Sequence, residues 1–128
     1  MKSFSVSQQF QVTAKTLYCA WLNSYEHTKM TGADAYIKQF MYVSFVTWDG
    51  YIKGKTTGLI ANEKIIQKWR TSDFKDEDPD SKVIILFKNN EEGCLLTIEH
   101  SKIPENQPDY EKGWVDFYFT PMLAYFSV

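Results

Sequence analysis

The chain has 128 residues, of which 44% are hydrophobic and 16% aromatic, enough for one domain with a substantial core and too few for two. The formal charge is −2, and the lack of a basic excess argues against a nucleic-acid partner. No apolar run is long enough to span a membrane, and the first residues lack the apolar segment of a signal peptide. We therefore expect a single cytoplasmic domain over residues 1–128.

The two cysteines, Cys19 and Cys94, lie far apart in the sequence and form no CxxC pair. We predict two buried free thiols in a reducing compartment, because cysteines in such a compartment rarely form disulfides and this spacing does not match a zinc site. No other pattern points to a metal site or a cofactor.

The first part of the chain predicts a strand followed by two short helices. Apolar residues alternate with polar ones over residues 4–12, which is typical of a strand with one face in water. Thr13 can cap a helix over residues 14–23. Ser24 can cap a second helix that ends at Gly32, because glycine readily adopts the left-handed conformation that closes a helix.

From residue 34 onward the pattern changes to strands. A weak strand is expected over residues 35–40, and a stronger one over residues 42–48, which are rich in aromatic and β-branched side chains. Asp49-Gly50 is the clearest hairpin signal in the chain, and it leads into a strand over residues 51–60.

Three further antiparallel strands are predicted over residues 64–71, 83–87 and 94–102. The acidic segment 73–80 separates the first two of them. It lacks the turn glycine and the final glutamate of a calcium-binding loop, so we interpret it as a solvated connection.

The most aromatic part of the chain is the C-terminal run of residues 113–126, where aromatic side chains recur at helical spacing. With Pro108 at the first helical position, a helix over residues 108–126 would be about 28 Å long, and a six-stranded sheet is roughly 24 Å across. We expect a kink near Thr120, because Pro121 removes a backbone hydrogen bond.

This order of elements predicts an α+β fold. About six antiparallel strands wrap around the long C-terminal helix, and two short helices follow the first strand on one side of the sheet. The space where the sheet and the long helix diverge is the natural place for a pocket.

Spaced motifs over nearly the whole chain resemble the Aha-type family, whose domains are similar to the C-terminal domain of the activator of a heat-shock chaperone ATPase. The motifs are Trp48-Asp49-Gly50, Gly54-Lys55, residues 64–70, Ile103-Pro104, Gly113-Trp114, Tyr118-Phe119, and Glu26-His27 with Thr31-Gly32. This family belongs to the SRPBCC, or START-like, helix-grip superfamily. The resemblance implies that fold and a stress-related role. It does not imply chaperone stimulation by itself, because the eukaryotic activators make their main chaperone contact through a separate N-terminal domain.

The first hypothesis for function is a non-enzymatic protein that binds an apolar or amphipathic small molecule, or a lipid, between the sheet and the C-terminal helix. Gln67 and His100 share strand faces with apolar residues, and an apolar cavity with a few polar groups is the usual composition of a small-molecule site. Gln67 would pair with His100, a water or the ligand. The predicted lining is Ile65, Gln67, Trp69, Ile85, Phe87, Leu96, Ile98, His100, Trp114, Phe117, Tyr118 and Met122.

Two alternatives come from other classes of protein. One is a co-chaperone-like interaction module with a chaperone as partner. The other is a cyclase- or hydrolase-like enzyme that uses His100, although the chain has no nucleophile elbow, Walker loop or HExxH motif. We expect His27 on an exposed helix and Trp48 in a purely structural turn. The protein is predicted to be a monomer or a weak homodimer that uses Tyr36, Phe40 and Tyr42.

Overall fold

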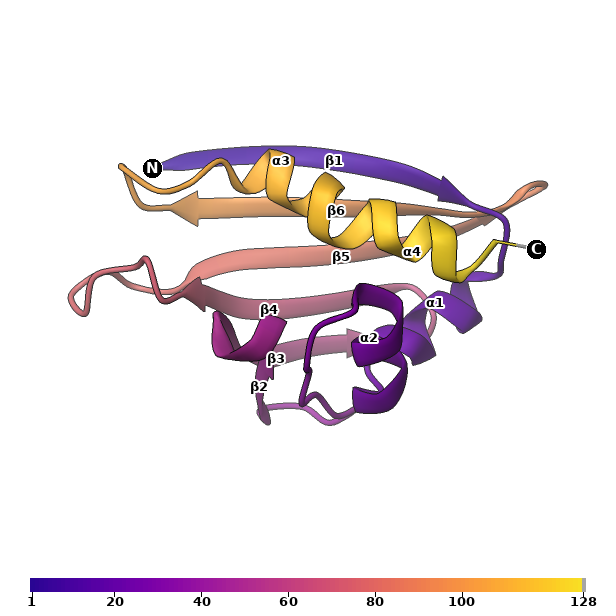
Figure 1. The fold of residues 1–128 in the computed structure, drawn as a ribbon, viewed down its shortest axis with the longest axis horizontal. Helices are drawn as coiled ribbons and strands as arrows, with labels where there is room; N and C mark the ends of the chain where they lie inside the picture. Colours follow the sequence, from indigo (N-terminus) through magenta and orange to yellow (C-terminus); the bar gives the residue numbers. More distant parts are fainter. Residues whose placement is uncertain (128) are drawn as a thin grey trace.

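A six-stranded antiparallel sheet carries the helices of the chain on one face (Figure 1). The computed structural model describes residues 1–127. The strands are β1 (Lys2–Phe10), β2 (Ser44–Thr47), β3 (Ile52–Ile60), β4 (Lys64–Thr71), β5 (Ser81–Asn90) and β6 (Gly93–Ile103), in the spatial order β1-β6-β5-β4-β3-β2. The N-terminal strand therefore lies beside the last one, and the predicted α+β fold is confirmed.

The predicted strand over residues 35–40 is wrong. This segment makes a single bridge, between Tyr36 and Val46. Its backbone bonds go to the second helix instead, because the Ser24 hydroxyl accepts from the Ile37 N–H at 2.9 Å and donates to the Ile37 carbonyl at 2.9 Å. Side-chain partners therefore replace the sheet ladder here.

The two short helices are α1 (Ala14–Trp21) and α2 (Ser24–Thr31). Thr13 caps α1 as predicted, and Gly32 closes α2 in the left-handed conformation with φ 82°. The cap of α2 is Asn23, rather than Ser24. Its extended backbone also ends the preceding helix earlier than expected.

The C-terminal helix is laid across the sheet in three consecutive parts, α3 (Tyr110–Trp114), a π-helical turn (Val115–Phe119) and α4 (Thr120–Tyr125). It begins two residues later than predicted, because the Asp109 side chain accepts from the Lys112 N–H and so occupies the N-cap. The expected irregularity at Pro121 takes the form of the π turn. A proline ring conflicts with the carbonyl four residues earlier in a regular α-helix, and the wider turn removes that conflict.

The core lies between the sheet and the helices and is built largely from stacked aromatic rings. Trp21 of α1 stacks on Tyr118 with 4.8 Å between ring centroids, and Trp114 lies 4.9 Å from Tyr118 and 5.7 Å from Trp69. Trp114 and Tyr118 are each 3% exposed. The predicted packing of the C-terminal helix against the sheet is therefore confirmed.

The two cysteines, and an aromatic segment between α2 and β2, differ in their exposure to solvent. Cys94 is buried, but Cys19 is exposed, because it lies on α1 opposite the side that carries Leu17 and Trp21. Both thiols are free. Three aromatic residues between α2 and β2, offered as a dimer surface, are each more than half exposed: Tyr36, Phe40 and Tyr42. No helix within residues 1–127 is long and apolar enough to cross a membrane.

Candidate functional site

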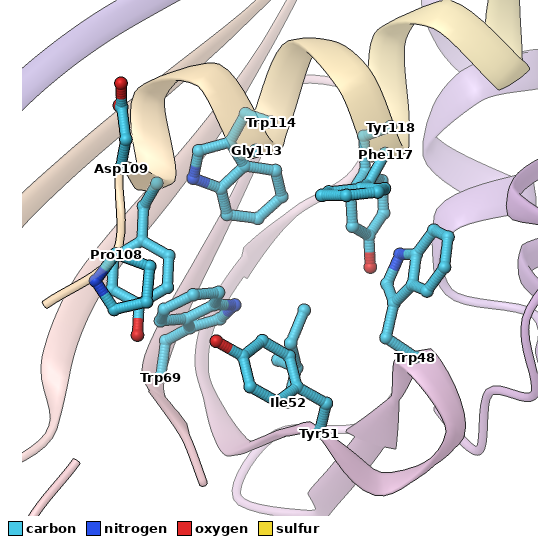
Figure 2. Close-up of a pocket in the computed structure, with 11 residues that line it drawn as sticks. Trp48, Tyr51, Ile52, Trp69, Pro108, Asp109, Gly113, Trp114, Phe117 and Tyr118 are labelled. Atoms are coloured by element: carbon cyan, nitrogen blue, oxygen red, sulfur yellow. The ribbon is translucent and has the colours of Figure 1, made fainter. Parts of the chain in front are cut away.

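An aromatic cavity of about 380 Å³ opens between the start of the C-terminal helix and the β2–β3 hairpin (Figure 2). In Figure 2, Trp114, Phe117 and Tyr118 descend from the helix, and Trp48 and Tyr51 face them from the hairpin. The lining residues are Trp48, Tyr51, Ile52, Trp69, Pro108, Asp109, Tyr110, Gly113, Trp114, Phe117 and Tyr118. We call this space the aromatic cavity.

Four of the twelve predicted lining residues border the aromatic cavity: Trp69, Trp114, Phe117 and Tyr118. The other eight lie beneath or beside it in the packed interior: Ile65, Gln67, Ile85, Phe87, Leu96, Ile98, His100 and Met122. The alternation of apolar and polar residues along a strand identifies the side chains that face inward. It does not show whether an inward side chain lines the cavity or is packed in the interior. The middle of the sheet is covered by α1, whose Tyr18 packs 5.6 Å from the Phe87 ring.

Sequence reasoning misses Trp48, because the sequence predicts only a structural turn there. It begins the short helical turn Trp48–Gly50, and its ring lies 5.3 Å from the Phe117 ring across the mouth of the aromatic cavity. The turn is fixed by Asp49, whose carboxylate accepts from the Asp34 N–H at 2.8 Å. The other missed lining residues are Tyr51, Ile52, Pro108, Asp109, Tyr110 and Gly113. The sequence contains a signal for one of them: Gly113 lies one helical turn before Phe117, so the two residues share a side of the helix.

His100 belongs to a buried chain of hydrogen bonds that holds two walls of the aromatic cavity. The Trp114 indole N–H donates to His100 Nδ1 at 3.1 Å, so the proton of the neutral ring resides on Nε2. That N–H donates to the Ser81 hydroxyl at 2.9 Å, which in turn donates to the Trp69 carbonyl at 2.7 Å. Burial lowers the pKa of His100 to about 3, so the ring is neutral at pH 7.

His27 is buried, so the prediction of an exposed position is wrong. His27, Met30 and Thr31 recur at helical spacing and form the face of α2 that is turned inward. The Trp21 carbonyl can only accept, so His27 Nδ1–H donates to it at 2.7 Å, and Tyr118 donates to His27 Nε2 at 2.8 Å. Burial lowers the pKa of His27 to about 4 and raises that of Tyr118.

Gln67 does not pair with His100, which is one of the three partners that the sequence predicts for it. Its amide nitrogen lies 3.5 Å from the Thr56 hydroxyl on the neighbouring strand, whereas both ring nitrogens of His100 are occupied by Ser81 and Trp114. Gln67 is not among the residues that line the aromatic cavity.

The rim of the aromatic cavity is tied together by tyrosine hydroxyls. Tyr110 donates to the Gln107 side chain at 2.7 Å, and Gln107 donates to the Asp73 carbonyl at 3.1 Å. Tyr51 donates to the Asp73 carboxylate at 2.5 Å. Burial raises the pKa of both tyrosines, so they remain neutral donors at pH 7.

Asp109 is the carboxylate on the lining, and its side chain caps the C-terminal helix. No lysine or arginine borders the aromatic cavity. Within residues 1–127, no group of three His, Cys, Asp or Glu side chains is placed to hold a metal ion. The lining is therefore suited to contact with an uncharged, largely apolar molecule.

The sheet, the long helix laid over it and the cavity between them define an α+β domain of the helix-grip class. The chain belongs to the family of Activator of Hsp90 ATPase homolog 1-like proteins, whose model matches residues 11–127. The family predicted from the spaced motifs is thus confirmed. No curated protein matches the chain.

Several solved structures share the fold. An HSP90 activator from Plasmodium falciparum is 23% identical, with a TM-score of 0.85 over 96% of this chain and 94% of that one. The Aha1 dimer from Colwellia psychrerythraea is 13% identical, with a TM-score of 0.77 over 98% and 94%. A protein from Chromobacterium violaceum is 17% identical, with a TM-score of 0.77 over 98% and 97%. At these identities the likeness concerns the fold.

Proposed function

We propose that this protein binds a small, largely apolar molecule in the aromatic cavity and does not act as an enzyme. The observation that carries the proposal is the cavity itself, an opening of about 380 Å³ in which seven of the eleven lining residues are aromatic. Clefts of this volume and composition are typical of small-molecule sites. Two buried hydrogen-bond chains, through His100 and His27, support it by fixing Trp69, Trp114 and Tyr118 in place.

The state of His100 favours binding over catalysis. A serine nucleophile needs a histidine nitrogen that accepts its proton, but the His100 lone pair is already taken by the Trp114 N–H. Ser81 and His100 are each 1% exposed, so neither reaches a substrate in the aromatic cavity. This geometry argues against the hydrolase-like alternative.

Native mass spectrometry of the protein isolated from its host tests the proposal. We expect a bound small molecule that denaturation releases. The matched controls are two substitutions at Gly113, where an added Cβ would meet only Phe117 at 3.9 Å. Gly113→Leu should fill the aromatic cavity and abolish retention, whereas Gly113→Ala should preserve it. A wild-type protein that repeatedly carries no small molecule, and binds none from a host extract, would contradict the proposal.

A second candidate function, an interaction module for an acidic protein surface, is favoured by a stripe of lysines on the outer face of the sheet. Lys55 lies opposite Lys68, and Lys68 lies opposite Lys82, on three adjacent strands. All three are exposed, and none forms an ion pair within residues 1–127. Like charges directly opposite each other destabilise a sheet, so an acidic partner would relieve this repulsion. The related Plasmodium falciparum protein is described as an HSP90 activator.

An ATPase assay with the heat-shock chaperone of the same host tests this second function. Wild-type protein should stimulate the ATPase, and the double variant Lys55→Glu/Lys68→Glu should not. Lys15→Glu, on the exposed side of α1, makes a charge change away from the stripe and should leave stimulation intact. No stimulation by the wild type at tens of micromolar, about the weak end of specific affinity, would remove this candidate.

A further inference from the structure

Trp48 has the one buried side-chain nitrogen or oxygen within residues 1–127 that lacks a hydrogen-bond partner, its indole Nε1. The residue is also strained, because it adopts φ 52°, a left-handed conformation that bulky side chains rarely take. The following residue, Asp49, has φ 57°. Strained backbone that the surroundings hold in place is concentrated at ligand-binding sites.

A half-exposed side chain, Phe117, lies beside the Trp48 indole. Figure 2 shows the nitrogen edge of the indole turned toward Phe117 and Tyr118. Phe117 lies against this indole at 5.3 Å and 65°, yet it is 55% exposed. It also sits within the π-helical turn, a distortion that is frequent at functional sites. Rotation of the Phe117 ring into solvent would therefore uncover the donor with little loss of core packing.

The three tyrosine hydroxyls on the lining already donate to other residues of the protein. Tyr51 donates to Asp73, Tyr110 donates to Gln107, and Tyr118 donates to His27. Two indole N–H groups of the lining, those of Trp48 and Trp69, remain without a partner among the described residues, and that of Trp48 is the buried one. The other polar feature of the rim is the Asp109 carboxylate, and no cation lines the cavity to balance an acidic ligand. These features select a neutral ligand with a hydrogen-bond acceptor.

The shape of the ligand follows from the walls. Trp69 and Trp114 face the cavity with rings tilted by 36° to each other, and the Trp48 and Phe117 rings close the opposite side. Aromatic walls favour stacking and edge contacts with another flat ring, and flexible alkyl chains gain less from such surfaces. A planar molecule can therefore contact several of these rings at once.

We propose that the aromatic cavity takes a neutral, planar aromatic compound with a hydrogen-bond acceptor, such as a ring ketone, and that Trp48 recognises the acceptor through its indole N–H after Phe117 turns aside. This inference rests on the proposed function of the cavity and adds the ligand class and the recognising residue. An unmade hydrogen bond at a buried donor is costly, so an acceptor that reaches it adds affinity.

Two bicyclic compounds that differ only in a carbonyl group, indane and 1-indanone, test the inference. Their affinities are measured by calorimetry for the wild type and for Trp48→Phe, which keeps an aromatic ring but lacks the N–H. The ratio of the 1-indanone affinity to the indane affinity should fall roughly 5- to 10-fold in the variant, in line with the loss of one hydrogen bond. In proton–nitrogen NMR spectra, 1-indanone should move the Trp48 indole N–H resonance downfield, and indane should not.

The outcomes separate this inference from the function on which it rests. If both compounds bind, but Trp48→Phe leaves the affinity ratio unchanged and the Trp48 resonance does not respond to 1-indanone, the recognition by Trp48 is wrong while the cavity still binds ligands. If neither compound binds while the protein still retains a molecule from its host, the ligand class is wrong and the proposed function stands; the proposed function fails with it only if no host molecule is retained either. Phe117→Ala, which uncovers the N–H, should raise the affinity for 1-indanone, and a spectrum with native dispersion establishes that each variant is folded.

Discussion

At the scale of single residues, two buried histidines hold the wall of the aromatic cavity. Both are neutral, and both have low pKa values. Each one orients an aromatic residue of the cavity wall, His100 through the Trp114 N–H and His27 through the Tyr118 hydroxyl. Burial disfavours the charged ring, which explains both shifts. The histidines are therefore interpreted as positioning residues, because they act on a ligand only through the tryptophan and the tyrosine that they hold.

These pKa values predict how stability depends on pH. In the unfolded chain both histidines titrate near 6.5, whereas in the folded protein they titrate at about 4 and about 3. Between those values the unfolded state binds more protons, so stability is full above about pH 6.5 and decreases as the pH falls. The free energy of unfolding should decrease by up to about 1.4 kcal/mol per pH unit for each histidine. Urea denaturation between pH 7 and pH 5 measures this free energy of unfolding. A value that does not change with pH would contradict the assignment of two buried, neutral histidines.

Removal of the Tyr118 hydroxyl tests how the bond to His27 contributes to stability and to the cavity wall. Tyr118→Phe leaves the His27 Nε2 lone pair buried without a donor, which should cost about 1–3 kcal/mol of unfolding free energy. The phenyl ring keeps its stacking on Trp21 but is no longer held by His27, so ligand retention should weaken. Urea denaturation and native mass spectrometry measure the two effects. A variant as stable as the wild type would show that the hydrogen bond is absent in solution.

At the scale of elements, the pairing of β2, β3 and β4 sets the position of the hairpin that carries Trp48. Gly54 of β3 lies directly opposite Trp69, and a Cβ there would collide with the Lys68 carbonyl and the Phe45 ring. Only glycine fits between these neighbours, so this close contact ties the hairpin to the strand that supplies Trp69.

Substitution of two glycines should therefore have opposite effects. Gly54→Ala should reduce the free energy of unfolding by at least about 2 kcal/mol, because backbone atoms of β4 would have to move. Gly113→Ala has room and lies in a helix, so it should be neutral or stabilise the protein by up to about 1 kcal/mol. Thermal and urea denaturation of both variants make the comparison, and equal stabilities would refute the proposed contact at Gly54.

The elements of the sheet could be predicted from the sequence, whereas the detailed boundaries of the helices could not. Residues 64–71 were predicted with the observed bounds because alternation there is uninterrupted. The sequence predicts a kink near Pro121 but not the π turn that precedes it. A proline indicates that its ring conflicts with the carbonyl four residues earlier, but it does not indicate how the helix avoids that conflict. Segment 35–40 was misjudged because Ser24, a residue of another element, satisfies the Ile37 backbone.

At the scale of the whole molecule, the aromatic cavity lies where the C-terminal helix begins rather than along its full length. The sequence places Trp69, Trp114 and Tyr118 on facing surfaces, which was enough to predict that sheet and helix meet. It does not give the depth of each residue, so the interior residues Ile65, Ile85 and Leu96 could not be distinguished from lining residues. Trp48 was missed because its place in the cavity depends on the backbone of the turn.

The central claim is that the space between Trp69, Trp114 and Phe117 is a ligand site and not an accident of packing. A crystal structure of the protein purified from its host tests this claim most directly. We predict continuous electron density for a flat molecule inside the aromatic cavity, within contact distance of Trp48. A structure in which these side chains move together and fill the cavity, with no density between them, would contradict the account.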